Sequence, residues 1–171
     1  MKVVLLGYMA SGKSSVGKAL ATKLGYHFID LDEEISNRVG MDVPTIFSEK
    51  GEIFFRRKET EVLEDILKGD NDIVLSLGGG TPCYGQNMQI IKKRTSNSFY
   101  LNLSIAGLTQ RIVKEKEQRP LVANIPDDEL PEFIGKHIFE RVQFYAMANH
   151  TVLVEHKTIE QIVLELEHYL I

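Results

Sequence analysis

Short apolar runs alternate along this chain with stretches in which apolar residues recur every three or four positions. A continuous run predicts a buried strand, and the longer spacing predicts a helix with one buried face. The runs predict strands at residues 2–6, 26–30, 73–77, 98–103 and 151–154. The spaced stretches predict helices at residues 16–24, 41–50, 52–67, 86–93, 105–112, 130–150 and 159–169. This alternation indicates an α/β fold, in which helices cover both faces of a parallel five-stranded sheet.

The loop after the first predicted strand matches the P-loop pattern G-x-x-x-x-G-K-[ST] at every specified position of residues 7–14. Its glycines allow phosphate oxygens to approach the backbone, and the start of the next helix adds a partial positive charge. Lys13 is expected to reach the β- and γ-phosphates of a nucleotide, and Ser14 to bind Mg²⁺. A plain Gly/Ser turn is the alternative, which the strand–loop–helix context disfavours. The residues expected to bind ATP here are Gly7, Ala10, Ser11, Gly12, Lys13, Ser14 and Ser15.

Two aspartates follow the second predicted strand. Asp30 and Asp32 are two residues apart, so both point to one face if the chain stays extended. One carboxylate at this edge of the sheet suits Mg²⁺, and another suits an acceptor hydroxyl. The alternative is a helix cap, because Asp32 precedes Glu33 and acids are common where a helix starts. We favour Asp30 as a metal ligand and Asp32 as a catalytic residue.

A glutamate lies on the apolar stripe of the helix predicted at residues 52–67. Unpaired burial of a carboxylate is costly, and Arg56 precedes Glu59 by three residues, within pairing reach on one helix. One interpretation is an exposed ion pair of little energetic value. The other is that Glu59 holds Arg56 so that the guanidinium faces a substrate carboxylate. The next strand ends in three glycines at residues 78–80, which form either a plain turn or a site of close ligand approach.

A polar segment at residues 114–127 has the composition of a mobile loop. A loop of this length is uncommon unless it is functional, and a phosphoryl-transfer enzyme needs a lid that excludes water. Arg119 on such a lid would supply positive charge to the transferring phosphate. A solvated surface loop is the alternative. In the next helix, Arg141 lies at the edge of the apolar face, as a surface arginine or as a second substrate contact.

Composition narrows the class of protein. The 171 residues fit one domain with a sizeable core, and the apolar and charged fractions of 43% and 26% are ordinary for a globular protein. The net charge of −4 and the pI of about 5.8 argue against a general nucleic-acid binder. No apolar run approaches membrane-spanning length and a strand begins at once, so we expect neither a membrane segment nor a signal peptide. Cys83, the only cysteine, suits a reducing cytoplasm, and the five histidines show no metal-ligand spacing.

Several motifs together resemble the shikimate kinase family. The P-loop alone identifies only a superfamily. The more specific motifs are F-I-D-L-D at 28–32, F-R-R-K-E at 55–59, L-G-G-G at 77–80, R-P-L at 119–121, and Arg141 four residues before Tyr145. The resemblance covers nearly the whole chain.

The resemblance implies a P-loop fold of the nucleoside-monophosphate-kinase type in one domain over residues 1–171. It places an acceptor-binding region at about 32–60 and a mobile lid at about 114–127. It implies transfer of the γ-phosphate of ATP to the 3-hydroxyl of shikimate with Mg²⁺ as cofactor, giving shikimate 3-phosphate and ADP in aromatic amino acid biosynthesis. We therefore expect a cytoplasmic monomer that binds ATP and shikimate but neither nucleic acid nor a membrane.

Residue roles follow from the same resemblance. Lys13 and Arg119 neutralise phosphate charge, and Asp32 orients or deprotonates the acceptor hydroxyl. Ser14 and Asp30 serve Mg²⁺, and Arg111 resembles the arginine that flanks adenine in the family. The residues implied to bind shikimate are Asp32, Arg56, Glu59, Gly78, Gly79, Gly80 and Arg141. One departure is that residues 156–158 lack the proline that the family often has near the adenine.

Two other classes compete with this interpretation. A gluconate kinase would share the fold class and the P-loop, but it does not explain Arg56, Arg141 or the triple glycine. A regulatory GTPase would carry an Asn-Lys-x-Asp guanine-reading motif, and no such tetrapeptide occurs in the sequence.

Overall fold

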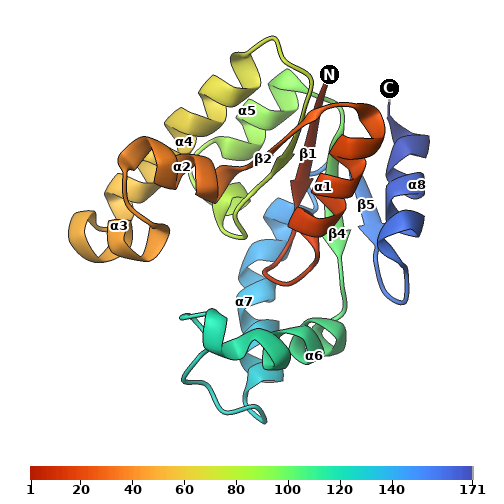
Figure 1. Ribbon diagram of the computed structural model, residues 1–171. Helices are drawn as coiled ribbons and strands as arrows, with labels where there is room; N and C mark the ends of the chain where they lie inside the picture. The colour runs from red at the N-terminus through yellow and green to blue at the C-terminus, as the bar shows by residue number, and fades with distance from the viewer. Residues whose placement is uncertain (171) are drawn as a thin grey trace.

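A parallel five-stranded sheet forms the centre of the protein (Figure 1). The computed structural model describes residues 1–170. The strands are in the order β2-β3-β1-β4-β5, and each neighbouring pair is parallel. Their bounds are Lys2–Leu6 (β1), His27–Asp30 (β2), Ile73–Ser76 (β3), Ser98–Asn102 (β4) and His150–Leu153 (β5). The predicted fold class is confirmed.

Helices cover both faces of this sheet. Figure 1 shows α1 and α8 on one face and α4, α5 and α7 on the other, with α2 and α3 projecting to one side. The bounds are Lys13–Leu24 (α1), Leu31–Val39 (α2), Val43–Lys50 (α3), Glu52–Lys68 (α4), Asn87–Arg94 (α5), Ile105–Glu115 (α6), Leu130–Tyr145 (α7) and Ile159–Tyr169 (α8). Short 3₁₀ turns lie at Thr81–Cys83 (η1) and Lys116–Gln118 (η2). Within residues 1–170, no helix combines the length and the apolar character needed to cross a membrane.

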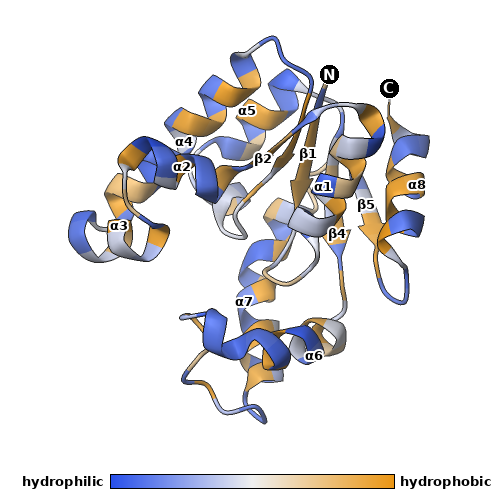
Figure 2. Cartoon of the chain, viewed as in Figure 1, coloured by the Kyte–Doolittle hydropathy of each residue, from blue (hydrophilic) through white to orange (hydrophobic). Residues whose placement is uncertain are grey.

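The central strands form the core because they are covered on both faces. Residues 3–6 of β1 are all fully buried, and Figure 2 shows hydrophobic colour along β1 but only hydrophobic stripes on the helices. Such continuous apolar strands are typical of parallel sheets. Since β1 lies between β3 and β4, the loops that follow β1 and β3 meet at the carboxyl edge of the sheet, where ligands bind in α/β folds.

The helix predicted at residues 130–150 is shorter than expected. α7 ends at Tyr145, and β5 begins at His150. The backbone N–H of Asn149 donates to Ser98 Oγ at 2.9 Å, and the Asn149 side-chain oxygen accepts from the same hydroxyl at 2.7 Å. This contact with β4 turns the chain into the sheet, although the apolar spacing alone continues past Tyr145.

The segment predicted as a loop from residue 114 begins inside a helix. α6 continues through Glu115, and a salt bridge of 2.5 Å between Arg119 Nη2 and Glu115 Oε2 supports its end. Lys116 Nζ bonds Asp127 Oδ1 at 2.9 Å across the base of the segment. Val122 is fully buried, so the segment also contacts the core. In Figure 1 the chain after α6 lies beyond the carboxyl ends of the strands; its mobility stays a prediction.

Candidate active site

The P-loop joins β1 to α1 and is held by its own backbone. Gly12 has φ 99° at the N-cap of α1, in the left-handed region that glycine adopts without strain. The Lys13 side chain folds back over the loop, and its Nζ donates to the carbonyl oxygens of Gly7 at 2.8 Å and Tyr8 at 2.9 Å. The ammonium group therefore lies at the centre of the loop, beside the helix N-terminus that favours phosphate.

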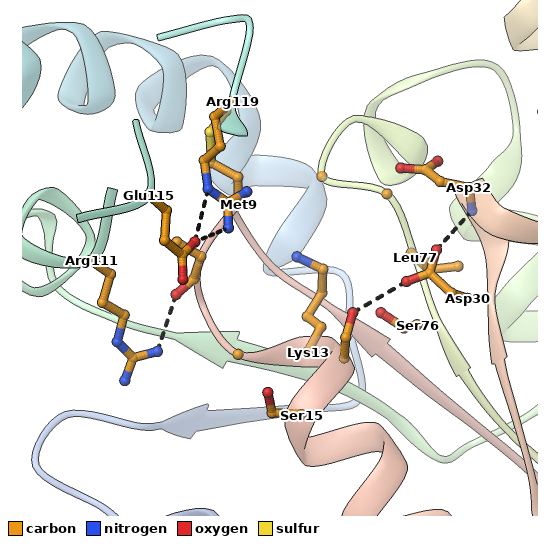
Figure 3. Close-up of a pocket in the computed structure, with 15 residues that line it drawn as sticks. Met9, Lys13, Ser15, Asp30, Asp32, Ser76, Leu77, Arg111, Glu115 and Arg119 are labelled. Atoms are coloured by element: carbon orange, nitrogen blue, oxygen red, sulfur yellow. Dashed lines mark hydrogen bonds and ion pairs between the residues drawn. The ribbon is translucent and has the colours of Figure 1, made fainter. Parts of the chain in front are cut away.

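A cavity of about 380 Å³ opens in front of this loop, at the carboxyl ends of β1 and β3. Figure 3 shows Lys13 in its middle, with Asp30 and Asp32 on one side and Arg111 and Arg119 on the other. The predicted residues that line it are Ala10, Gly12, Lys13, Ser14, Ser15, Asp30, Asp32, Gly78, Gly79, Arg111 and Arg119. The predicted residues outside its lining are Gly7, Ser11, Arg56, Glu59, Gly80 and Arg141. One cavity thus joins residues predicted for the nucleotide with residues predicted for the acceptor.

Ser14 and Asp30, the residues predicted to serve Mg²⁺, lie against each other. Ser14 Oγ is 3.2 Å from Asp30 Oδ2. A hydroxyl and a carboxylate are oxygen ligands of the kind that Mg²⁺ takes, together with water and substrate phosphates. Among residues 1–170, no group of three or more His, Cys, Asp or Glu side chains is arranged to hold a metal ion. The donor set therefore fits an ion that also binds a nucleotide, rather than an ion held by protein alone.

Asp30 also starts α2, and this corrects one prediction. Its Oδ1 accepts hydrogen bonds from the N–H groups of Asp32 at 3.1 Å and Glu33 at 3.3 Å, so Asp30 is the N-cap. Because α2 begins at Leu31, the chain is not extended through Asp32, and the two aspartates do not project as strand neighbours. Asp30 therefore caps the helix through Oδ1 and also lines the cavity, and Asp32 lines the cavity from the first turn of the helix.

The pKa of Asp32 is raised and that of Lys13 is lowered, which suits the first as a proton acceptor and leaves the second as a positive charge. Burial, followed by the nearby charges of Asp30 and Glu59, raises the pKa of Asp32 to about 6, while Lys13 and Arg56 act in the other direction. Burial lowers the pKa of Lys13 to about 8, against the effect of the two aspartates. A carboxylate with a pKa near neutrality is an efficient proton acceptor. At pH 7 the lysine remains largely charged and complements a phosphate.

The three glycines at residues 78–80 each leave room for a different side chain. A Cβ on the first would lie 2.8 Å from Oδ1 of Asp32, and one on the third would lie 2.9 Å from Nη2 of Arg56. A Cβ on the second would lie 3.3 Å from Nη1 of Arg141. Larger residues would therefore displace these side chains. The plain-turn interpretation is insufficient, because the glycines bring both arginines close to the cavity edge.

Arg56 is held by a buried network that begins at Glu59. Only 1% of the Glu59 side chain is exposed, so the interpretation of a surface ion pair is wrong. Glu59 Oε1 accepts from Arg56 Nη1 at 2.9 Å, and Oε2 accepts from Thr81 Oγ1 at 2.7 Å. Asn87 Nδ2 donates to the Thr81 carbonyl at 2.9 Å, and Thr60 Oγ1 donates to Asn87 Oδ1 at 2.8 Å. The network fixes the guanidinium relative to the glycine turn.

Arg141 is positioned by two neighbours on α7. One turn after it, the Tyr145 hydroxyl donates to the Gly79 carbonyl at 2.7 Å. One turn before it, His137 Nδ1 lies 2.9 Å from the hydroxyl of Tyr8 in the P-loop. α7 is thus attached to both loops that form the cavity, with Arg141 between the two attachments. This placement favours a substrate contact over a surface arginine.

The two arginines on the nucleotide side are held differently. Arg111 Nη1 donates to the carbonyl of Ala10 in the P-loop at 3.1 Å. Arg119 forms two bonds to Glu115 Oε2, from Nε at 3.1 Å and from Nη2 at 2.5 Å. Figure 3 shows this pair at the cavity wall on the side away from the aspartates. Arg111 is thus tied to the P-loop, whereas Arg119 lines the cavity while paired with Glu115.

Comparison with known proteins identifies the family. The family model described as shikimate kinase matches residues 9–170. The chain belongs to the shikimate kinase family. A shikimate kinase from Flavobacterium psychrophilum is 43% identical over 169 residues, which are 99% of this chain and 98% of that protein.

Solved structures from the shikimate kinase family agree with this assignment. The shikimate kinase of Bacteroides thetaiotaomicron is similar with a TM-score of 0.91 and 35% identity, covering 98% of this chain and 97% of the other. The shikimate kinase of Acinetobacter baumannii, solved in complex with shikimate, is similar with a TM-score of 0.87 and 28% identity, covering 98% and 90%. The resemblance inferred from the motifs is confirmed.

Apart from Glu59, the sequence did not reveal the residues that hold the two arginines of this shikimate kinase family member. A buried glutamate needs a second hydrogen-bond partner, so Glu59 signals that a donor such as Thr81 exists, but its spacing does not say where. Tyr8 occupies an unspecified P-loop position, and its partner His137 is 129 residues away. No short motif connects residues so far apart.

Proposed function

We propose that this protein transfers the γ-phosphoryl group of ATP to the 3-hydroxyl of shikimate, giving shikimate 3-phosphate and ADP. One observation carries the proposal: the P-loop cavity contains Asp32, and the adjacent glycine turn faces Arg56 and Arg141. A proton acceptor beside two guanidinium groups suits an acceptor that carries both a hydroxyl and a carboxylate. Membership in the shikimate kinase family supports this choice of acceptor.

On the nucleotide side, the P-loop residues bind the phosphates of ATP. Lys13 contacts the β- and γ-phosphates and compensates charge as the phosphoryl group moves, and Arg111 flanks the adenine. Ser14 and Asp30 hold Mg²⁺, since their oxygens are 3.2 Å apart at the cavity wall. When bound there, the ion would supply positive charge against the phosphates. Arg119 adds a second positive charge once it is released from Glu115.

On the acceptor side, Asp32 receives the proton of the 3-hydroxyl as the oxygen attacks phosphorus. Arg56 and Arg141 bind the carboxylate, a role for which a planar guanidinium offers two parallel hydrogen bonds. Glu59 keeps Arg56 in place, and residues 78–80 allow the acceptor to approach. The region at about 32–60 therefore forms the acceptor-binding part of a single domain over residues 1–171.

We place the reaction in the cytoplasm and assign it to a monomer. The only cysteine, Cys83, cannot form a disulfide within the chain, which suits a reducing compartment.

The acceptor is tested with purified enzyme, ATP and Mg²⁺ against shikimate, gluconate and shikimate with its carboxylate replaced by an amide. We expect efficient phosphorylation of shikimate, weak phosphorylation of the amide with a much higher KM, and none of gluconate. Arg56→Lys keeps the positive charge but loses the two parallel N–H donors of the guanidinium. The KM for shikimate should therefore rise about ten- to hundredfold, while the KM for ATP should change little.

The matched control is Arg57→Lys, an exposed neighbour on the same helix, which should behave like the native enzyme. Arg56→Lys should change the KM for the amide much less than the KM for shikimate, because the contact of the amide with the guanidinium is already weak. An equal response would show that Arg56 does not bind the carboxylate. Phosphorylation of gluconate in place of shikimate would contradict the proposed function itself.

The segment at about 114–127 is proposed as a lid that closes over both substrates. Its attachments are the Lys116–Asp127 and Arg119–Glu115 pairs and the buried Val122. Limited proteolysis should cut within this segment in the free enzyme, and ATP analogue plus shikimate should protect it. Mass spectrometry of the fragments locates the cuts. Equal cutting with and without ligands would indicate a passive loop.

A further inference from the structure

Tyr84 lies directly on the guanidinium of Arg56. The Arg56 Cζ atom is 3.8 Å from the centre of the Tyr84 ring, which places the guanidinium over the face of the ring. Tyr84 follows η1, four residues after the last of the three glycines, and 36% of it is exposed. A cation over an aromatic face is attracted by the ring electrons. The ring therefore restricts the orientation of the guanidinium from the side opposite to the protein core.

The hydroxyl of Tyr84 has a separate partner. It donates to Glu52 Oε1 at 2.9 Å, and that same oxygen lies 3.8 Å from Nε of Arg56. The distance to Nε is within ion-pair range but beyond a hydrogen bond. Arg56 Nε is buried and has no hydrogen-bond acceptor within residues 1–170. Burial and the bond to Glu52 raise the pKa of Tyr84, so the hydroxyl remains a proton donor.

The carboxylates of Glu52 and Glu59 both lie near the Arg56 guanidinium, and the Tyr84 hydroxyl is bonded to that of Glu52. Glu59 already accepts from Nη1 at 2.9 Å. If Glu52 also bonded Nε, a second negative charge would lie against the guanidinium and would repel an incoming carboxylate. A tyrosine hydroxyl that holds Glu52 leaves the remaining positive charge of Arg56 for the acceptor.

We propose that Tyr84 is a positioning residue for acceptor binding, whose ring orients Arg56 and whose hydroxyl holds Glu52 3.8 Å from Arg56 Nε, too far for a direct hydrogen bond with the guanidinium. This inference rests on the proposed function only in that Arg56 binds the acceptor carboxylate. It assigns to Tyr84 and Glu52 an effect on the affinity for shikimate, and none on the binding of ATP or on the chemical step.

The test separates the ring from the hydroxyl by steady-state kinetics at saturating ATP. Tyr84→Phe keeps the ring but releases Glu52, and it should raise the KM for shikimate about threefold, the size expected for an exposed ion pair. Tyr84→Leu also removes the ring and should raise this KM about five- to thirtyfold. In both variants, kcat and the KM for ATP should remain native.

The decisive variant is the double substitution Tyr84→Phe with Glu52→Gln. If released Glu52 causes the defect, removal of its charge should return the KM for shikimate to the native value. A loss of packing at Tyr84 would not be rescued in this way. Glu52→Gln alone should leave this KM at or below the native value.

Two matched controls accompany these variants. Tyr169→Phe alters a tyrosine of similar exposure, 39%, on α8. Glu64→Gln removes a charge on the same helix as Glu52, from a side chain that is 43% exposed. Both should be native. The proposal is overturned if Glu52→Gln does not restore the KM for shikimate of Tyr84→Phe. It is also overturned if Tyr84→Phe has a native KM for shikimate while Arg56→Lys has a raised one. If Arg56→Lys is itself unimpaired, the role of Arg56 in the proposed function fails first, and this inference fails with it.

Discussion

The Lys13→Ala variant is expected to lose about 10³-fold in kcat while it keeps its fold. The Lys13 ammonium is held 2.8 Å from the Gly7 carbonyl and 2.9 Å from that of Tyr8, at the centre of the P-loop. A positive charge that is already in place stabilises the transition state without reorganisation, and loss of one such group costs about 10²–10³-fold or more. Single-turnover and steady-state rates at saturating ATP and shikimate measure the effect, and circular dichroism monitors the fold.

The control for this prediction is Lys18→Ala. Lys18 is exposed on the same helix, where its Nζ lies 5.7 Å from the ring centre of Phe28. It should retain native turnover, because its charge does not face the cavity. Native turnover of Lys13→Ala with an unchanged spectrum would instead contradict the assignment of the P-loop as the phosphate site.

The second large effect is expected for Asp32→Asn, which should bind ATP normally and lose about 10²–10⁴-fold in kcat, the usual contribution of a general base. Asparagine fills nearly the same space beside Gly78 but cannot accept the proton. Since the pKa of Asp32 is raised to about 6, the native kcat should also fall as the pH drops through this value. A pH–rate profile without this acidic limb would remove Asp32 from the proton transfer.

The same substitution should stabilise the protein. The pKa of Asp32 rises from 3.8 in the unfolded chain to about 6 in the folded state, so ionisation at neutral pH opposes folding and protonation below pH 3.8 removes this penalty. Asp32→Asn should therefore raise the melting temperature at pH 7.5 and raise it less at pH 4.5. Glu33→Gln, an exposed control in the same turn, should show no such gain. A destabilised but active Asp32→Asn would support a purely structural role.

Local patterns predicted the fold because the signals are short-range. Residues 3–6 form a continuous apolar run that is buried on both sides, and the P-loop motif specifies its own turn. The N-caps of α6 and α8 are local as well, since Ser104 and Thr158 each accept from a backbone N–H three residues later. These features depend on neighbours within a few positions, which a sequence displays directly.

One error has a local cause, and another arose where a tertiary contact decides the structure. The assumption of an extended chain through Asp32 failed because the Asp30 side chain ends β2 and starts α2 within one residue. α7 stops at Tyr145 because Asn149 bonds Ser98 on a strand about fifty residues earlier. Spacing within a helix carries no information about such a partner.

The acceptor side shows the same limit. The sequence suggested that Glu59 holds Arg56, and the structure has this bond at 2.9 Å. It did not suggest that Thr81 also bonds the Glu59 carboxylate or that Tyr84 covers the Arg56 guanidinium. Thr81 and Tyr84 belong to a turn that comes close to Arg56 only because α4 packs against η1 and α5. A motif can identify a charged residue, but not the neutral residues that orient it.

The position of β1 in the sheet has a consequence for how the chain folds. This central strand is made before its partners, which begin at Ile73 in β3 and Ser98 in β4. At a synthesis rate of about 5–20 residues per second, β1 waits several seconds on the ribosome for the strands that bury it. Contacts so distant in sequence also slow folding, because the intervening loop must close before they form. The strand that carries the phosphate loop is thus the segment most exposed to aggregation during synthesis.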